Sequence, residues 1–194
     1  MGLGVLILGL VIFLANHVFV TFRDARDGLI VRLGQNGYRA AFSLVSLIGL
    51  ALIVWGFARY RASGMIPVWT PPDFMRHVTV GLMLFAVIVF VATFVPSHIK
   101  TWAKHPMLAA IKIWAFAHLL DNGDLGSILM FGGFLAWAVY ARIAAKRRGD
   151  LGPKAGPAGW GGDIVVVVGG IVVYWLLGTY FHPYVIGVPV FTRA

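Results

Sequence analysis

Residues 2–22 read GLGVLILGLVIFLANHVFVTF, an apolar run without a single lysine, arginine or aspartate. A transmembrane helix needs about 20 such residues to cross about 30 Å of hydrocarbon. The apolar residues do not alternate with polar ones, as they would on a half-buried strand. No positively charged segment precedes the run, which distinguishes it from a cleavable signal peptide. The stretch therefore predicts a membrane helix that stays in the protein.

The rest of the chain repeats this pattern. Of its 194 residues, 60% are hydrophobic and 12% are charged, whereas about 25% are charged in a soluble domain. The mean hydropathy is +0.87. We predict an all-α, polytopic membrane helix bundle that forms a single domain over residues 1–194. Its expected helices, about six in number, are 2–22, 38–58, 77–96, 106–120, 125–145 and 163–181.

The sequence lacks the residues that several kinds of catalytic and metal site require. The chain has no cysteine and no glutamate, and its seven acidic residues are all aspartates. Disulfides, iron–sulfur clusters, thiol catalysis and carboxylate-rich metal cages are therefore not expected. The net charge of +9 is assigned to loops beside anionic lipid headgroups, and no nucleic-acid partner is predicted.

The basic residues predict an orientation. Connections 23–37, 97–105 and 146–162 carry most of the lysines and arginines. By the positive-inside rule these connections are cytoplasmic, so both termini lie outside. The proline-rich segment 63–74 is then an external loop, and the glycine- and proline-rich segment 147–163 is a cytoplasmic linker. Glycines within the helices, such as Gly49, Gly56 and Gly170, are expected to let helices approach closely.

Histidines inside apolar runs are the first candidates for a site, because ionisable groups are costly at membrane depth. His17 either lies at the interface at a helix end or faces the bundle, with Asn16 and Thr21 as polar neighbours. His118 either caps its helix near water or serves as a ligand.

The residues around His118 favour a ligand role. At helical spacing it shares a face with Trp114 and Ala115, and Asp121 follows one turn later. The small Ala115 and Ala117 leave lateral room for a flat ligand, Trp114 is expected to line it, and Asp121 to accept the ring N–H.

Haem iron suits this supply of ligands better than zinc. Zinc usually takes three or four protein ligands, whereas haem needs one or two axial imidazoles. His105 and His118 are thirteen residues apart, about 20 Å along one helix, so they cannot bind one metal together. Arginines and lysines near the cytoplasmic ends, Arg23 and Arg39 among them, are candidates to meet the propionates.

The motifs NHVFVTFRDARDGL (residues 16–29) and KHPMLAAIKIWAFAHLLDNGDLGS (residues 104–127) resemble the NnrU family of bacterial membrane proteins. The resemblance is clearest over residues 1–145, and it implies the bacterial inner membrane, with the termini periplasmic. A plastid relative, the zeta-carotene cis–trans isomerase, uses haem b. The isomerase also has a cysteine shortly before its second ligand, where this chain has Trp114 and Ala115.

The resemblance implies that His17 and His118 are the axial ligands, while His105 matches a histidine of less defined role. The expected depth of the histidines in the membrane ranks the possible ligand pairs differently. With the termini outside, His17 and His118 differ in depth by about 12 Å, so His17 with His105 is the depth-consistent alternative. Both pairs stay open at this point.

Three functions follow as hypotheses. The first is a haem b protein that performs redox-gated chemistry or sensing on a lipophilic polyene or on nitric oxide. The second is a non-enzymatic accessory factor for nitrite and nitric oxide reduction. The third, a transporter using Lys112, His118 and Asp121, is the least favoured, because no inverted repeat is visible. The sequence does not decide the oligomeric state or whether the protein is an enzyme.

Overall fold

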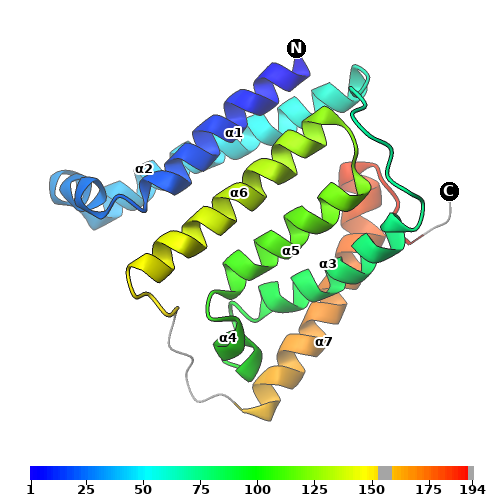
Figure 1. Cartoon of the computed structure of the whole chain (residues 1–194). Coiled ribbons are helices and arrows are strands. Elements are labelled where there is room, and N and C mark those ends of the chain that lie inside the picture. Colours follow the sequence, from blue (N-terminus) through cyan, green and yellow to red (C-terminus); the bar gives the residue numbers. More distant parts are fainter. Residues whose placement is uncertain (153–158, 192–194) are drawn as a thin grey trace. The chain divides into compact units, whose positions relative to one another are not determined.

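The computed structural model describes residues 1–152 and 159–191, and helices dominate them (Figure 1). The only β-type pairing within these ranges is one isolated bridge between Pro67 and Asp124. The elements are α1 (Gly2–Phe19), α2 (Arg23–Ala62), α3 (Met75–Val91), α4 (His98–Ala103), α5 (Pro106–Asp121), α6 (Leu125–Arg147), α7 (Trp160–Leu176) and the π-helix η1 (Leu177–Ile186). The predicted all-α class is confirmed.

Within residues 1–152 and 159–191, four helical stretches are long and apolar enough to cross a membrane. They are Gly2–Phe19, Arg23–Ala62, Leu125–Arg147 and Trp160–Ile186, the last combining α7 with η1. The apolar α3 has 17 residues and α5 has 16, so both fall short of the about 20 residues that span hydrocarbon without tilt or thinning. The helices are those of a membrane protein, and the predicted count of about six spans is not confirmed.

Helix α2 departs most from the predicted boundaries. Residues 23–37 were expected to form a connection, yet they are helical and run on into the predicted span, so that α2 has 40 residues. Gly34 interrupts it with φ 71° and ψ 163°, a conformation that glycine adopts without steric cost. The charged first part and the apolar second part are therefore two helical arms joined at Gly34.

The described residues form two compact units. Unit 1 comprises Met1–Pro71 with Asn122–Ala144, and unit 2 comprises Pro72–Asp121 with Ala145–Ala194. The predicted single domain is not tested by this division.

In unit 1, α1 and the second arm of α2 run antiparallel in close contact. A Cβ built on Gly9 would lie 2.6 Å from the backbone nitrogen of Ile53, and one on Gly49 would lie 2.9 Å from that of Phe13. Gly56 likewise meets the backbone of Leu6. The prediction that Gly49 and Gly56 permit close approach is confirmed, and it follows from the absence of a side chain at these positions.

Helix α6 completes unit 1. Its residues Met130 and Phe134 pack on a core formed by Leu6, Leu10 and Ile53. The loop after α2 is held to this unit, because the backbone nitrogen of Ile66 donates to the Tyr60 hydroxyl at 2.8 Å. The segment predicted as a loop, residues 63–74, contains no helical residue.

In unit 2, α3 packs against α5 and α7. The Tyr174 hydroxyl of α7 donates to the carbonyl of Val80 at 3.0 Å. A Cβ on Gly170 would meet Ile88 at 2.6 Å, so this glycine also marks a close contact between helices. Both contacts join α7 to α3 within the unit.

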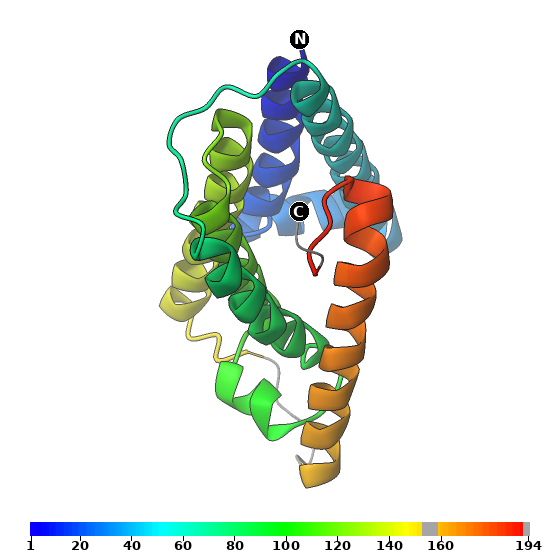
Figure 2. The same ribbon diagram turned by 90° about the vertical axis from the view of Figure 1, so that its right-hand side faces the viewer.

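The last helix is longer than predicted and changes its winding. Figure 2 shows α7 continuing without a break into η1. The π-helix contains Pro183 and ends at Gly187, whose φ of 76° is left-handed. A π-turn places one more residue in each turn than an α-turn, which re-aims the side chains that follow. The predicted linker 147–163 lies partly outside the described residues, and α7 begins at Trp160.

Candidate functional site

His17 lies near the end of α1 among three aromatic rings of unit 1. The centre of its ring is 4.1 Å from that of Phe13, 5.2 Å from Phe42 and 5.4 Å from Trp137. Its Nδ1 lies 2.7 Å from the carbonyl oxygen of Phe13. A carbonyl only accepts, so Nδ1 carries the proton and Nε2 holds the lone pair that can bind a metal.

The two polar residues expected beside this imidazole bind other partners. Asn16 donates through Nδ2 to the carbonyl of Phe42 at 3.0 Å and to Oγ of Ser46 at 2.9 Å. The Thr21 hydroxyl lies 3.0 Å from that of Tyr140. These bonds fix the end of α1 against α2 and α6, and thereby fix the backbone that carries the histidine.

A cavity of about 280 Å³ adjoins this region of unit 1. Apolar side chains of α1 and of both arms of α2 line it, and Asn16 and Tyr38 add polar groups. Phe42 lines the cavity and also touches the ring of His17 with its edge. The cavity is therefore separated from this histidine by one aromatic side chain.

His118 repeats the local geometry of His17 in unit 2. Its Nδ1 lies 2.9 Å from the carbonyl oxygen of Trp114, one turn earlier in α5. The same reasoning places the proton on Nδ1 and the lone pair on Nε2. The Trp114 ring lies 5.5 Å from the imidazole, which agrees with its predicted place beside this histidine. A backbone carbonyl, and not the expected carboxylate of Asp121, accepts from Nδ1.

Two alanines of α5 that were expected to leave room for a flat ligand lie inside unit 2. Ala115 and Ala117 are both fully buried, and the Thr79 hydroxyl of α3 donates to the carbonyl of Ala117 at 2.8 Å. At Ala117 the small side chain admits α3, so this side of α5 is filled by protein. The room for a flat ligand on the His118 side stays a prediction.

His105 lies in the turn before α5 and is tied to a loop. Its Nε2 is 3.2 Å from the carbonyl oxygen of Asp150 and 3.9 Å from a carboxylate oxygen of the same residue. Here Nε2 is the donor, so His105 carries its proton on the other ring nitrogen from the one protonated in His17 and His118.

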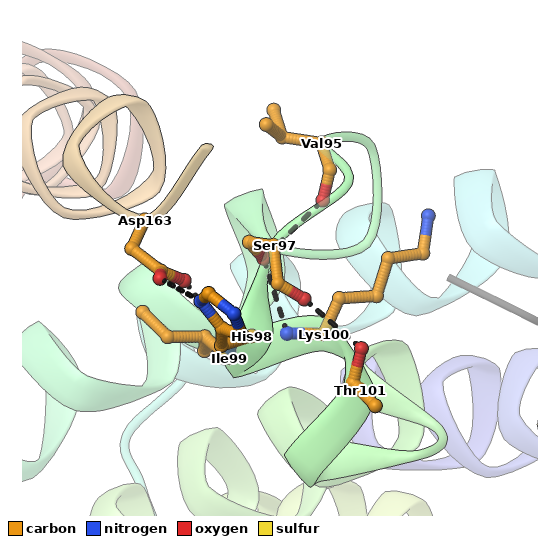
Figure 3. Close-up of polar contacts among 7 residues, drawn as sticks. All are labelled: Val95, Ser97, His98, Ile99, Lys100, Thr101 and Asp163. Atoms are coloured by element: carbon orange, nitrogen blue, oxygen red, sulfur yellow. Dashed lines mark hydrogen bonds and ion pairs between the residues drawn. The ribbon is translucent and has the colours of Figure 1, made fainter. Parts of the chain in front are cut away.

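His98 has a structural role at the start of α4. Figure 3 shows Asp163 of α7 beside it, with Nδ1 of His98 2.6 Å from the carboxylate. The same carboxylate accepts from the backbone nitrogen of Ile99 at 3.2 Å. Ser97 caps the helix by accepting from the Lys100 nitrogen at 3.1 Å. The imidazole thus helps to join α4 to α7.

The arginines predicted for propionates lie on α2. Arg23 and Arg39 are both exposed. Arg26, on the same arm as Arg23, lies over the ring of Tyr38 at 5.6 Å. The cations are accessible, and no contact ties Arg23 or Arg39 to a histidine within the described ranges.

A third histidine, His182 of η1, lies beside His118. The centres of the two rings are 6.3 Å apart and their planes are inclined by 27°. Nδ1 of His182 is buried and has no hydrogen-bond partner among the residues described. No sequence signal indicates this contact, since it depends on the π-winding of η1.

Imidazoles are the nitrogen ligands that these sites offer. Across residues 1–152 and 159–191, no three histidines or acidic residues gather in a geometry that would hold a metal ion. Haem supplies four nitrogens of its own and asks the protein for one or two. The ligand-ready tautomers of His17 and His118 fit that requirement.

Comparison with known proteins gives one match. The family described as NnrU protein matches residues 5–190, which is nearly the whole chain. The curated proteins contain no significant match to the sequence. The same holds for the solved structures.

Proposed function

The chain belongs to the NnrU family, and we propose that it is a membrane protein that binds haem b through imidazoles of different helices. His17 of α1 and His118 of α5 are the proposed axial ligands. A bound haem would supply redox chemistry, and a small ligand would reach the iron where reduction frees one of the two imidazole positions. The proposed activity is redox-gated chemistry or sensing.

One observation carries the proposal. Both histidines give Nδ1–H to the carbonyl four residues earlier, at 2.7 Å for His17 and 2.9 Å for His118. Metal-bound histidines usually donate their second ring nitrogen in this way, which fixes the tautomer and the ring orientation. Because the acceptor is the backbone of the same helix, each imidazole is oriented before any metal binds.

The surrounding residues contribute the apolar setting that haem requires. Aromatic rings pack around each imidazole, with Phe13, Phe42 and Trp137 at His17 and Trp114 at His118. These rings give each imidazole apolar neighbours. We further propose that exposed arginines of α2, Arg23 and Arg39 among them, meet the propionates.

The cavity of unit 1 supports a lipophilic ligand for this function. Its apolar lining and its position behind Phe42 suit a hydrocarbon chain or a gas such as nitric oxide. Isomerisation of a lipophilic polyene is one chemistry of this class.

The test is a visible spectrum of the full chain, purified in detergent after expression with ample haem, in the oxidised and dithionite-reduced states. We expect a Soret band that weakens in His17→Ala and in His118→Ala. His77→Ala is the matched control, because His77 is exposed at the start of α3 and its band should equal that of the wild type.

A colourless wild-type protein would contradict haem binding and leave the accessory role in nitrite and nitric oxide reduction as the better hypothesis. A band that is full in both His17→Ala and His118→Ala would refute the assigned ligands.

A further inference from the structure

The imidazole of His118 is flanked by two other rings of unit 2. Trp114 lies 5.5 Å away with its plane inclined by 53°, and His182 lies 6.3 Å away with its plane inclined by 27°. Both distances fall within the range of direct aromatic contact. The Nδ1–H bond to the Trp114 carbonyl holds one edge of the ring, and these neighbours restrict its rotation about that edge.

Contacts within unit 2 hold the segment that follows His182 in place. Arg76 of α3 donates through Nη2 to the carbonyl of Pro189 at 2.9 Å and lies 3.2 Å from that of Val190. The backbone nitrogen of Val188 donates to the carbonyl of His182 at 3.1 Å. The segment after η1 is thus folded back and fastened to the helix that also holds α5.

The π-winding adds to this placement. His182 lies within η1, directly before Pro183, whose ring cannot donate the backbone hydrogen bond of a regular helix. π-turns inside helices occur frequently at functional sites, and they change the direction of the side chains that follow. Here the side chain that is re-aimed is the one that contacts His118.

His182 contacts His118 through the face of its ring. Nδ1 of His182 is buried and has no partner within the described residues, although buried polar atoms nearly always have one. The inclination of 27° is that of two nearly parallel rings. His182 therefore supplies His118 with a flat ring surface rather than with a hydrogen bond.

We propose that His182 is a positioning residue for the His118 ligand, and that with Trp114 it holds the imidazole plane in one orientation. The inference rests on the proposed haem function. The orientation of an axial imidazole affects how its orbitals overlap with the iron, so it affects the g-values of low-spin ferric haem and its midpoint potential. His182 therefore tunes the iron without binding it.

The experiment compares His182→Ala with His182→Phe in the full haem-loaded chain, by ferric EPR and by redox titration. His182→Ala removes the flat ring, so we expect altered g-values and a shifted midpoint potential at wild-type haem content. His182→Phe keeps a flat ring and should restore both values. His77→Ala is the control and should change neither.

A ring that only stabilises the fold would lower the unfolding midpoint of His182→Ala and leave the g-values unchanged, which would overturn the proposal. A high-spin spectrum in His182→Phe would also overturn it, since the imidazole itself would then be a ligand. If His182→Ala does not fold, His182→Leu tests the same loss of a flat side chain. A wild-type protein without haem would instead refute the proposed function, so the two failures are distinguishable.

Discussion

Thr79 shows how a single side chain fixes the backbone next to a proposed ligand. It is 7% exposed, and its hydroxyl donates to the carbonyl of Ala117, the residue before His118, at 2.8 Å. A buried hydroxyl without such a partner would be costly in a membrane. The bond therefore stabilises the contact of α3 with α5 and fixes the depth of the histidine.

We predict that Thr79→Val lowers the free energy of unfolding by about 0.6 kcal/mol, and by no more than about 1.7 kcal/mol, the range for hydrogen bonds between membrane helices. The measurement is the unfolding midpoint when SDS is added to mixed micelles. Thr101→Val is the control, because Thr101 is exposed and its hydroxyl lies 3.2 Å from a carbonyl of its own helix turn. Equal midpoints for the two variants would show that the bond to Ala117 adds nothing.

At the scale of the element, the contact of α1 with α2 depends on glycines at particular positions. Gly9 faces the backbone of Ile53, whereas a Cβ on Gly4 of the same helix would meet nothing within 4 Å. The two glycines look alike in sequence. Only the packing of α2 on one face of α1 distinguishes them.

Gly9→Ala is expected to destabilise the protein by about 1–3 kcal/mol, because the added methyl group must displace the backbone of α2. Gly4→Ala should leave stability unchanged or raise it by up to about 1 kcal/mol, since alanine favours a helix more than glycine does. The same SDS titration measures both. A midpoint for Gly9→Ala at or above that of Gly4→Ala would be incompatible with the packing described.

At the scale of the whole molecule, the distribution of basic residues predicts the orientation in the membrane. The chain contains no cysteine, so a single introduced thiol reports its own location. The exposed Asp73 and Arg148 lie in connections assigned to opposite sides.

Asp73→Cys is expected to react with a membrane-impermeant maleimide added to intact spheroplasts, and Arg148→Cys only after permeabilisation. Labelling of both after permeabilisation is the control for thiol reactivity. The reverse pattern would place the termini in the cytoplasm and invert the topology.

The sequence by itself determined the fold class and the family. Long apolar runs with few charges have one stable solution in lipid, in which each helix satisfies its own backbone. The contact of Trp114 with His118 was also within reach of the sequence, because it depends on spacing along a single helix. So were the glycines Gly49 and Gly56 as points of close approach. His17 and His118 were candidates because ionisable groups are costly inside apolar runs, and the family resemblance pairs them.

The tertiary structure decided what depends on contacts between distant segments. The helical arm that begins at Arg23 occupies residues where hydropathy indicates a connection, and Gly34, with φ 71°, joins it to the second arm of α2. The face of α5 at Ala117 is filled because α3 packs against it. The contact of His182 with His118 depends on the π-winding of η1, which local sequence preferences do not specify. Hydrophobic patterns fix which segments are buried, but which side chains meet is set by helix packing, and so only the folded chain shows the neighbours of its histidines.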